Sequence, residues 1–119
     1  MIVLLVCLAG GVGALTRFVV DGIIRSKLGR DFPWGTIVIN GSGALLLGGI
    51  TALALHHNVS TTYKVVLGTG FCGGYTTFST ASFETVRLLE EKRPWAAVFH
   101  VLANIGITVS VASLALWFL

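Results

Sequence analysis

The sequence has few charged residues, few prolines and only two cysteines. Eight Lys and Arg and five Asp and Glu make up 11% of its 119 residues, against about 25% in ordinary soluble domains. A soluble domain this small needs a charged surface around one modest core, and these residues are too few to supply it. Cys7 and Cys72 both lie inside apolar runs, which favours buried thiols over a disulfide or a metal pair. These shortages exclude a disordered chain, a disulfide-stapled secreted domain and a conventional soluble enzyme.

Apolar residues are what the sequence has in abundance. They make up 55% of the chain, and the mean hydropathy is +0.89. They form four runs, each close to the roughly 20 residues that a helix needs to cross a bilayer. We therefore expect one domain, residues 1–119, of the all-α membrane class, with four transmembrane helices at about 2–24, 34–55, 65–86 and 95–118.

Positive charges are distributed unevenly between the two sides that four spans define. One side, with both termini and the middle loop, has only Lys64. The loops after the first and third runs hold the other basic residues that lie between spans: Arg25, Lys27, Arg30, Arg87, Lys92 and Arg93. Cytoplasmic loops carry such an excess of Lys and Arg. Both basic loops are therefore predicted to face the cytoplasm and both termini the outside, and the net charge of +3 indicates no nucleic-acid partner.

The third run is interrupted in its middle by the string GFCGGYTTFSTAS. Glycine pairs and hydroxyl residues are poor helix formers, and non-helical backbone at membrane depth is tolerated only when it is buried in protein or lines a cavity. Freed carbonyls at such a break can bind a cation, and the N-terminus of the following half-helix favours anions. We therefore predict a third helix that is broken in mid-membrane at a functional site. A kinked helix packed through its glycines is the alternative.

Three polar side chains lie inside the apolar runs, where direct contact with lipid hydrocarbon would cost free energy. Arg17 either faces protein or water as a buried base, or snorkels near the end of its helix and pairs with Asp21. Asn40 either forms hydrogen bonds between helices or lines an aqueous path, where its N–H groups would meet a passing anion. Glu84 either caps the second half of the broken helix or sits at a pore mouth.

Other polar residues in the runs suit local or core hydrogen bonds. Thr36 and Ser42 are expected to bond the backbone of their own helix. Asn104 and Thr108 are one turn apart and share a face of the last helix, which fits either core hydrogen bonds or a polar track. His100 is interpreted as a hydrogen-bonded histidine rather than a proton relay.

Three motifs resemble the signatures of the CrcB/Fluc fluoride channel family. They are GGVGALTR (10–17), PWGTIVINGSG (33–43) and GFCGGYTTFST (70–80), and their order, their spacing and the four-span layout match over the whole chain. The resemblance implies an antiparallel dimer with two pores in the plasma membrane, which exports fluoride passively and relieves its toxicity. It also implies a structural sodium ion at the centre of the dimer, with no organic cofactor and no enzymatic activity.

The resemblance assigns roles to individual residues. It places the sodium-binding backbone carbonyls at Gly73 and Thr76, and the buried basic residue at Arg17. The family's pore phenylalanine is Phe78, whose positive ring edge could contact a small anion. The expected fluoride path as a whole holds Asn40, Phe78, Ser79, Thr80, Thr108 and Ser110, with Glu84 at the pore mouth.

One position departs from the family pattern. The second pore phenylalanine of the family is replaced by Ala81, and Phe83 points about 200° away from that position around the helix. Together with the charge bias, this predicts a partner subunit inserted in the opposite orientation, a paralogue rather than a second copy of this chain. A self-paired dimer is the alternative.

Two other functions are compatible with the length and the four spans. A small multidrug antiporter would need a carboxylate embedded in the first span, where only Asp21 near its end is available. A nonconducting partner subunit of a heteromeric fluoride channel would only stabilise its conducting partner. Membrane lipid surrounds the chain in every case.

Overall fold

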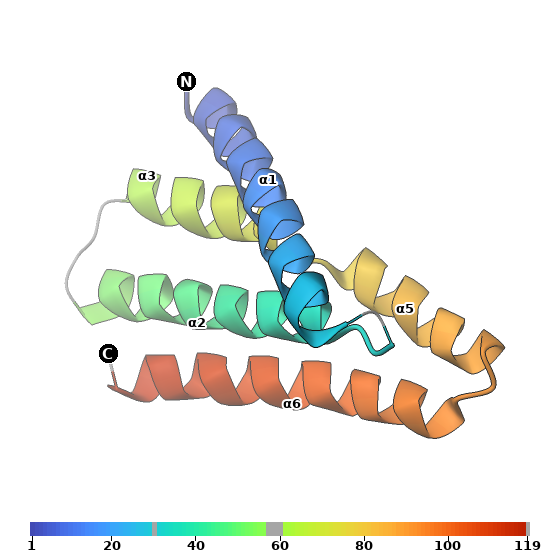
Figure 1. The fold of residues 1–119 in the computed structure, drawn as a ribbon. Helices are drawn as coiled ribbons and strands as arrows, with labels where there is room; N and C mark the ends of the chain where they lie inside the picture. Colours follow the sequence, from blue (N-terminus) through green and yellow to red (C-terminus); the bar gives the residue numbers. More distant parts are fainter. Residues whose placement is uncertain (30, 57–60, 119) are drawn as a thin grey trace.

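A computed structural model describes residues 1–29, 31–56 and 61–118, which are helical almost throughout and contain no strand (Figure 1). The prediction of an all-α chain is confirmed. In chain order the elements are α1 (Ile2–Leu28), α2 (Trp34–His56), α3 (Thr61–Tyr63), η1 (Lys64–Cys72), α4 (Gly73–Tyr75), α5 (Phe78–Glu90) and α6 (Pro94–Phe118).

Three of these helices, α1, α2 and α6, are long and apolar enough to cross a membrane. The spans predicted at 34–55 and 95–118 match α2 and α6 closely, whereas α1 continues past residue 24 to Leu28. Its extra turn is stabilised by an ion pair between Asp21 and Arg25, 3.1 Å apart and one turn apart along the helix. Gly29 then ends the helix with a φ of 83°, a conformation that glycine adopts without strain.

The third predicted span is helical in two parts. The chain winds without interruption through α3, the wide π-helical turns of η1, and α4, and then becomes extended at Thr76 and Thr77. The hydroxyl oxygen of Thr77 accepts a hydrogen bond from the N–H of Thr80 at 3.0 Å and so caps α5. The predicted interruption is therefore present, but Gly73 and Gly74 stay helical and the two threonines form the break.

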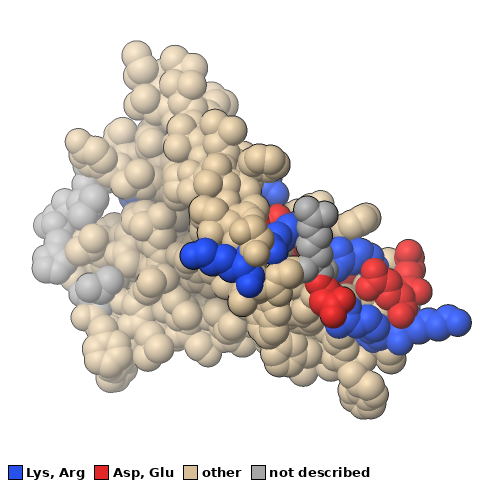
Figure 2. Space-filling model, viewed as in Figure 1, with Lys and Arg blue, Asp and Glu red and all other residues tan. Residues whose placement is uncertain are grey.

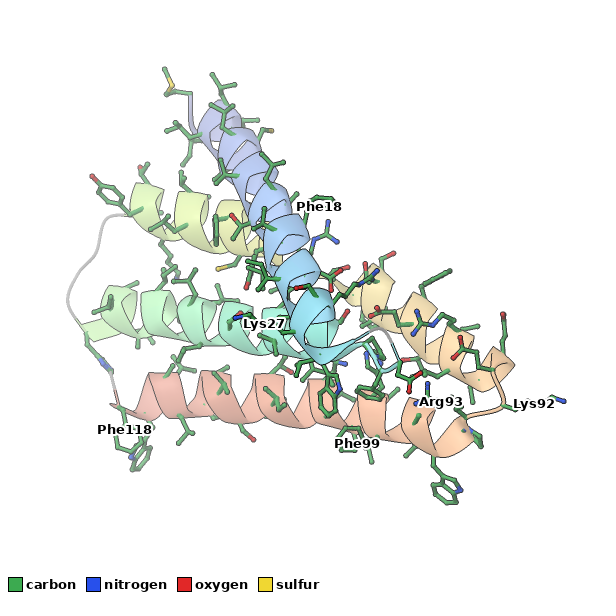
Figure 3. All side chains as sticks on the ribbon, viewed as in Figure 1. Phe18, Lys27, Lys92, Arg93, Phe99 and Phe118 are labelled. Carbon is green, nitrogen blue, oxygen red and sulfur yellow. The ribbon has the colours of Figure 1, made fainter. Side chains whose placement is uncertain are left out.

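The helices are arranged so that the two basic loops share one end of the molecule. α2 and α6 lie side by side, α1 crosses η1 and α4, and α5 packs on α6 (Figure 1). The α1–α2 connection and the α5–α6 turn lie at one end, away from both termini. Figure 2 shows Lys, Arg, Asp and Glu gathered over this end, and Figure 3 places Lys92 and Arg93 at the α5–α6 turn.

Glycines let α1 approach the third helix closely. Gly13 is the buried residue of α1, and a Cβ built on it would overlap the backbone carbonyl oxygen of Phe71. A Cβ on Gly74 would likewise overlap the carbonyl oxygen of Gly10. Small residues at such contacts allow the close backbone approach on which helix packing in membranes depends.

Most large apolar side chains point outward, as expected where the surrounding solvent is lipid. Phe18 and Phe118 project from the helices (Figure 3) and are 79% and 76% exposed. The two cysteines are both free, with Cys72 buried and Cys7 exposed. The prediction of buried thiols therefore holds for Cys72, while Cys7 faces outward from α1.

Candidate functional site

A groove of about 770 Å³ opens between α2, the break in the third helix and α6. Its walls are mostly apolar, with polar groups concentrated near the break. Five of the predicted site residues line it: Asn40, Gly73, Thr76, Phe78 and Thr108. The structure therefore brings together residues from three segments that are far apart in the sequence.

Asn40 holds the break from the side of α2. Its side-chain oxygen accepts the N–H of Thr77 at 3.0 Å, and its amide nitrogen donates to the carbonyl of Thr77 at 3.2 Å. The same nitrogen donates to the side-chain oxygen of Asn104 on α6 at 3.0 Å. Asn40 thus bonds between helices, the first of the two interpretations made from the sequence, and it also lines the groove.

The break releases the two carbonyls that the sequence motif assigns to a cation. In a continuous helix the carbonyl of Gly73 would accept from Thr77, and that of Thr76 from Thr80. The N–H of Thr77 instead donates to Asn40, and the N–H of Thr80 donates to the hydroxyl of Thr77. Gly73 is exposed, with open space where a Cβ would lie. Backbone oxygens of this kind are hard ligands, which suit a hard cation such as sodium.

Of the other predicted path residues, Phe78 and Thr108 also line the groove, and three do not. Phe78 begins α5 and is 87% exposed, and Thr108 donates its hydroxyl hydrogen to the carbonyl of Asn104 at 2.7 Å. An anion at Thr108 would therefore compete with a backbone acceptor for that hydrogen. The other three predicted residues are not part of the groove lining: Ser79, Thr80 and Ser110.

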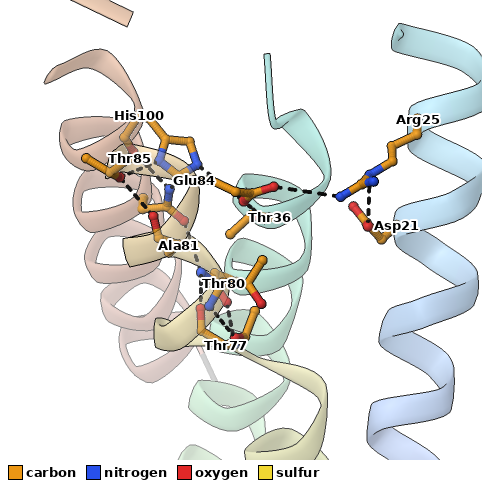
Figure 4. A network of polar contacts seen from close by, with 11 residues as sticks. Asp21, Arg25, Thr36, Thr77, Thr80, Ala81, Glu84, Thr85 and His100 are labelled. Carbon is orange, nitrogen blue, oxygen red and sulfur yellow. Dashed lines mark hydrogen bonds and ion pairs between the residues drawn. The ribbon is translucent and has the colours of Figure 1, made fainter. Parts of the chain in front are cut away.

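Glu84 lies in a buried polar cluster that joins four helices (Figure 4). The side chain on α5 is 3% exposed and accepts a hydrogen bond from the hydroxyl of Thr36 on α2. Its other oxygen is 3.9 Å from an Arg25 nitrogen on α1, and Nε2 of His100 on α6 is 3.9 Å from the first. The expectation that Thr36 bonds its own helix is wrong, because a buried carboxylate needs donors and takes this hydroxyl.

The local hydrogen bond expected of Ser42 is confirmed. It donates to the carbonyl of Ile39 at 3.1 Å, and its oxygen also lies 2.8 Å from the hydroxyl of Tyr75. The second contact ties α2 to α4, just before the break.

Arg17 does not pair with Asp21 as one interpretation proposed. Asp21 is engaged by Arg25, and Nε of Arg17 is buried with no hydrogen-bond partner among the residues that the structure describes. Arg25 lies one turn C-terminal to the acid, which is the favourable orientation for such pairs. Arg17 lies outside the groove lining, as does Glu84.

Sequence reasoning missed three participants in the site. Thr77 could have been recognised as a helix cap, because a hydroxyl residue directly precedes the helix start. Thr85 and Tyr75 could not have been recognised, since Thr85 acts by contact with His100 at 3.0 Å and Tyr75 by contact with Ser42.

Comparison with known proteins places the chain in a known family. The family model described as CrcB-like protein, Camphor Resistance (CrcB), matches residues 4–118. A fluoride-specific ion channel FluC 1 from Leifsonia xyli subsp. xyli is 46% identical over 117 residues, covering 98% of this chain and 85% of the relative. A fluoride-specific ion channel FluC 2 from Cutibacterium acnes is 49% identical over 119 residues, covering 98% and 97%. One from Pyrococcus horikoshii, fluoride-specific ion channel FluC, is 41% identical over 109 residues, covering 91% and 87%.

Proposed function

The chain belongs to the CrcB family, whose relatives are ion channels and not enzymes, and on that premise we propose that it is a subunit of a fluoride-selective passive channel. The observation that carries the proposal is the groove in which Asn40 clamps the break beside Phe78. A narrow path lined by amide, hydroxyl and ring-edge groups can replace the water around a small anion, as carbonyls do for cations in other channels.

Passive conduction fits the acidic residues better than proton-coupled transport does. Within the helices near the groove, Asp21 is paired with Arg25 and Glu84 accepts the Thr36 hydroxyl. A coupled antiporter needs an embedded carboxylate that is free to exchange protons with its substrate. Fluoride export then follows from an inside-negative membrane potential, which drives an anion outward without coupling.

We further propose that two subunits pair in antiparallel orientation through the open side of the groove. Phe78 is 87% exposed there, and the residues that the structure describes leave open space at the Cβ position of Gly73. The carbonyls of Gly73 and Thr76 from both subunits would hold a sodium ion, which supplies the positive charge that the freed carbonyls need. This arrangement would place the break in mid-membrane.

The partner in this proposal is a paralogue rather than a second copy. Ala81 lines the groove where the family pattern has an aromatic ring, so the partner would supply the missing ring. The basic loops at one end favour a single orientation of this chain in the cell membrane, with both termini outside. A partner of opposite orientation must then be a different chain.

The test is fluoride efflux from proteoliposomes, followed with a fluoride electrode and with chloride as the control ion. We expect no fluoride efflux from this chain alone. When an oppositely oriented paralogue is added, we expect fast fluoride efflux and no chloride efflux. Fast efflux from the chain alone would show that it pairs with itself. No fluoride efflux with any paralogue, together with loss of drug resistance in an Asp21→Asn strain, would instead favour the antiporter.

A variant pair separates a conducting subunit from a supporting one. Phe78→Ile should lower efflux from the complete channel, because it removes the ring edge at the start of α5. Phe83→Ile is the matched control, since Phe83 is 69% exposed on the same helix and does not line the groove. If both variants conduct normally, this chain is a nonconducting partner.

A further inference from the structure

His100 on α6 is fully buried and bonded at both ring nitrogens, yet no role in the fluoride path has been assigned to it. It is 0% exposed, and its ring meets the edge of Phe32 at a centroid distance of 5.6 Å. Nδ1 lies 3.0 Å from the hydroxyl of Thr85, and Nε2 lies 3.4 Å from the amide nitrogen of Asn104. These contacts connect His100 to Asn40 through one intervening side chain.

Backbone groups determine which way the two amides between His100 and the break must point. The N–H of Thr77 can only donate, so the Asn40 atom 3.0 Å away is its oxygen. The nitrogen of Asn40 therefore faces Asn104, whose oxygen must accept from it. The nitrogen of Asn104 is then directed to the carbonyl of His100, at 2.8 Å, and to Nε2 of the ring.

The same reasoning determines the tautomer of His100. Because Asn104 presents N–H groups, Nε2 must be the unprotonated acceptor. Thr85 donates its hydroxyl hydrogen to the carbonyl of Ala81 at 2.8 Å, so its oxygen is free to accept from Nδ1–H. Every polar atom in this series then has a partner of the correct kind, which a charged imidazolium would prevent by turning a second N–H toward Asn104.

The charged groups around the ring do not displace this arrangement. Glu84 on α5 is 3.9 Å from Nε2, but it already accepts from Thr36 on α2 and faces Arg25 on α1. The neutral Nδ1–H form is thus the one that the surrounding helices favour.

We propose that His100 is a positioning residue for the fluoride path: in its Nδ1–H form it orients Asn104, which orients Asn40 at the break. The inference rests on the proposed function, because Asn40 matters for conduction only in a fluoride channel. Asn40 presents its amide to the groove in the orientation that the Thr77 backbone and the Asn104 oxygen both support. Without the acceptor at Nε2, the Asn104 nitrogen keeps only the backbone carbonyl of residue 100 as its acceptor, and the orientation of the two amides is held less firmly.

The test compares His100→Leu with His100→Gln in the complete, conducting channel. Leucine fills the space without an acceptor, whereas glutamine can place an oxygen where Nε2 lies. We expect His100→Leu to lower fluoride efflux about fivefold, the rate equivalent of one hydrogen bond of about 1 kcal/mol, and His100→Gln to retain most of it. Unfolding midpoints of both variants are measured alongside, since a packing role would lower stability and efflux together in either variant.

A double substitution adds the coupling that the proposal requires. Asn104→Leu should lower efflux by a similar factor, and His100→Leu should have no further effect in that background, because it acts through Asn104. Independent, multiplying effects would overturn the proposal, as would equal efflux from His100→Leu and His100→Gln. No efflux from the wild-type complex would overturn the proposed function itself, so the two failures are distinguishable.

A second readout is independent of transport. Nitrogen NMR of the reconstituted protein should show a protonated Nδ1 and an unprotonated Nε2 for the histidine whose signals disappear in His100→Gln. A protonated Nε2 would overturn the proposal whatever the efflux measurements show, because Asn104 would then face a donor.

Discussion

Gly13→Ala is the substitution that most directly tests the close approach of α1 to the third helix. The added Cβ would overlap the carbonyl oxygen of Phe71 and lie 2.9 Å from the backbone nitrogen of Tyr75, where ordinary contacts begin at 3.4 Å. Both are backbone atoms, so no side chain can rotate away to make room. The helices must therefore move apart along this contact. Gly22→Ala is the matched control, since it lies on the same helix and a Cβ there meets nothing within 4 Å.

The size of the effect follows from two opposing contributions. Overpacking in a tight contact costs about 1–3 kcal/mol, while Ala in place of Gly in a helix gains up to about 1 kcal/mol. Both variants share the second contribution, so the difference between them isolates the overlap. We expect Gly22→Ala to be neutral or slightly stabilising, and Gly13→Ala to be less stable than Gly22→Ala by about 1–3 kcal/mol.

The assay is unfolding by SDS in mixed micelles, followed by tryptophan fluorescence, with the two variants purified and measured side by side. Efflux from proteoliposomes is recorded on the same samples, because α1 packs against the segment that ends at the break. Equal unfolding midpoints for the two variants would refute the reasoning, because they would mean that α1 and the third helix are not in close backbone contact at Gly13.

Two further predictions rest on hydrogen bonds and a third on the ion pair between Asp21 and Arg25. Thr77→Ala should lower the free energy of unfolding by about 1 kcal/mol, because it removes the hydroxyl that accepts the Thr80 N–H. Thr77→Ser keeps a hydroxyl and should retain most of the stability in the same SDS assay. Glu84→Ala should lower the free energy of unfolding by about 1–3 kcal/mol, because it leaves the buried Thr36 hydroxyl without its acceptor. Glu84→Gln retains a side-chain oxygen and should lower it less. Equal losses of stability in the two variants would contradict this reasoning. Asp21→Asn should leave fluoride efflux unchanged, and a large loss would show that the Asp21 carboxylate takes part in transport.

Local patterns were sufficient to bound α2 and α6 and to find the break, but not to bound the first and third helices. The runs that became α2 and α6 were bounded correctly to within a residue by their hydropathy, because the end of an apolar run coincides with the edge of the bilayer. The extension of α1 was missed because its last turn is polar, although the Asp21–Arg25 spacing signals it. The break was expected within the string GFCGGYTTFSTAS, and it lies at Thr76 and Thr77, while Gly73 and Gly74 stay helical.

The partners of the polar side chains were not predictable in the same way. Thr36 was expected to bond its own helix and instead bonds Glu84, and Arg17 was given a possible partner that Arg25 takes. For Asn40 the residue was identified from its position in an apolar run, but its contact with Thr77 was not. A run of sequence shows that a buried polar group needs a partner and does not show which helix will supply it.

The sequence by itself determined that the chain is a membrane protein, where α2 and α6 lie, that the third helix is interrupted and that the basic loops share a side. These properties depend on composition and on neighbours a few residues apart, and hydrocarbon imposes them on any such chain. The tertiary structure decided which groups meet at the groove. The bonds at the groove join residues 37 and 64 positions apart, because the glycine contacts and helix crossings, rather than any local pattern, set which side chains come within hydrogen-bond reach.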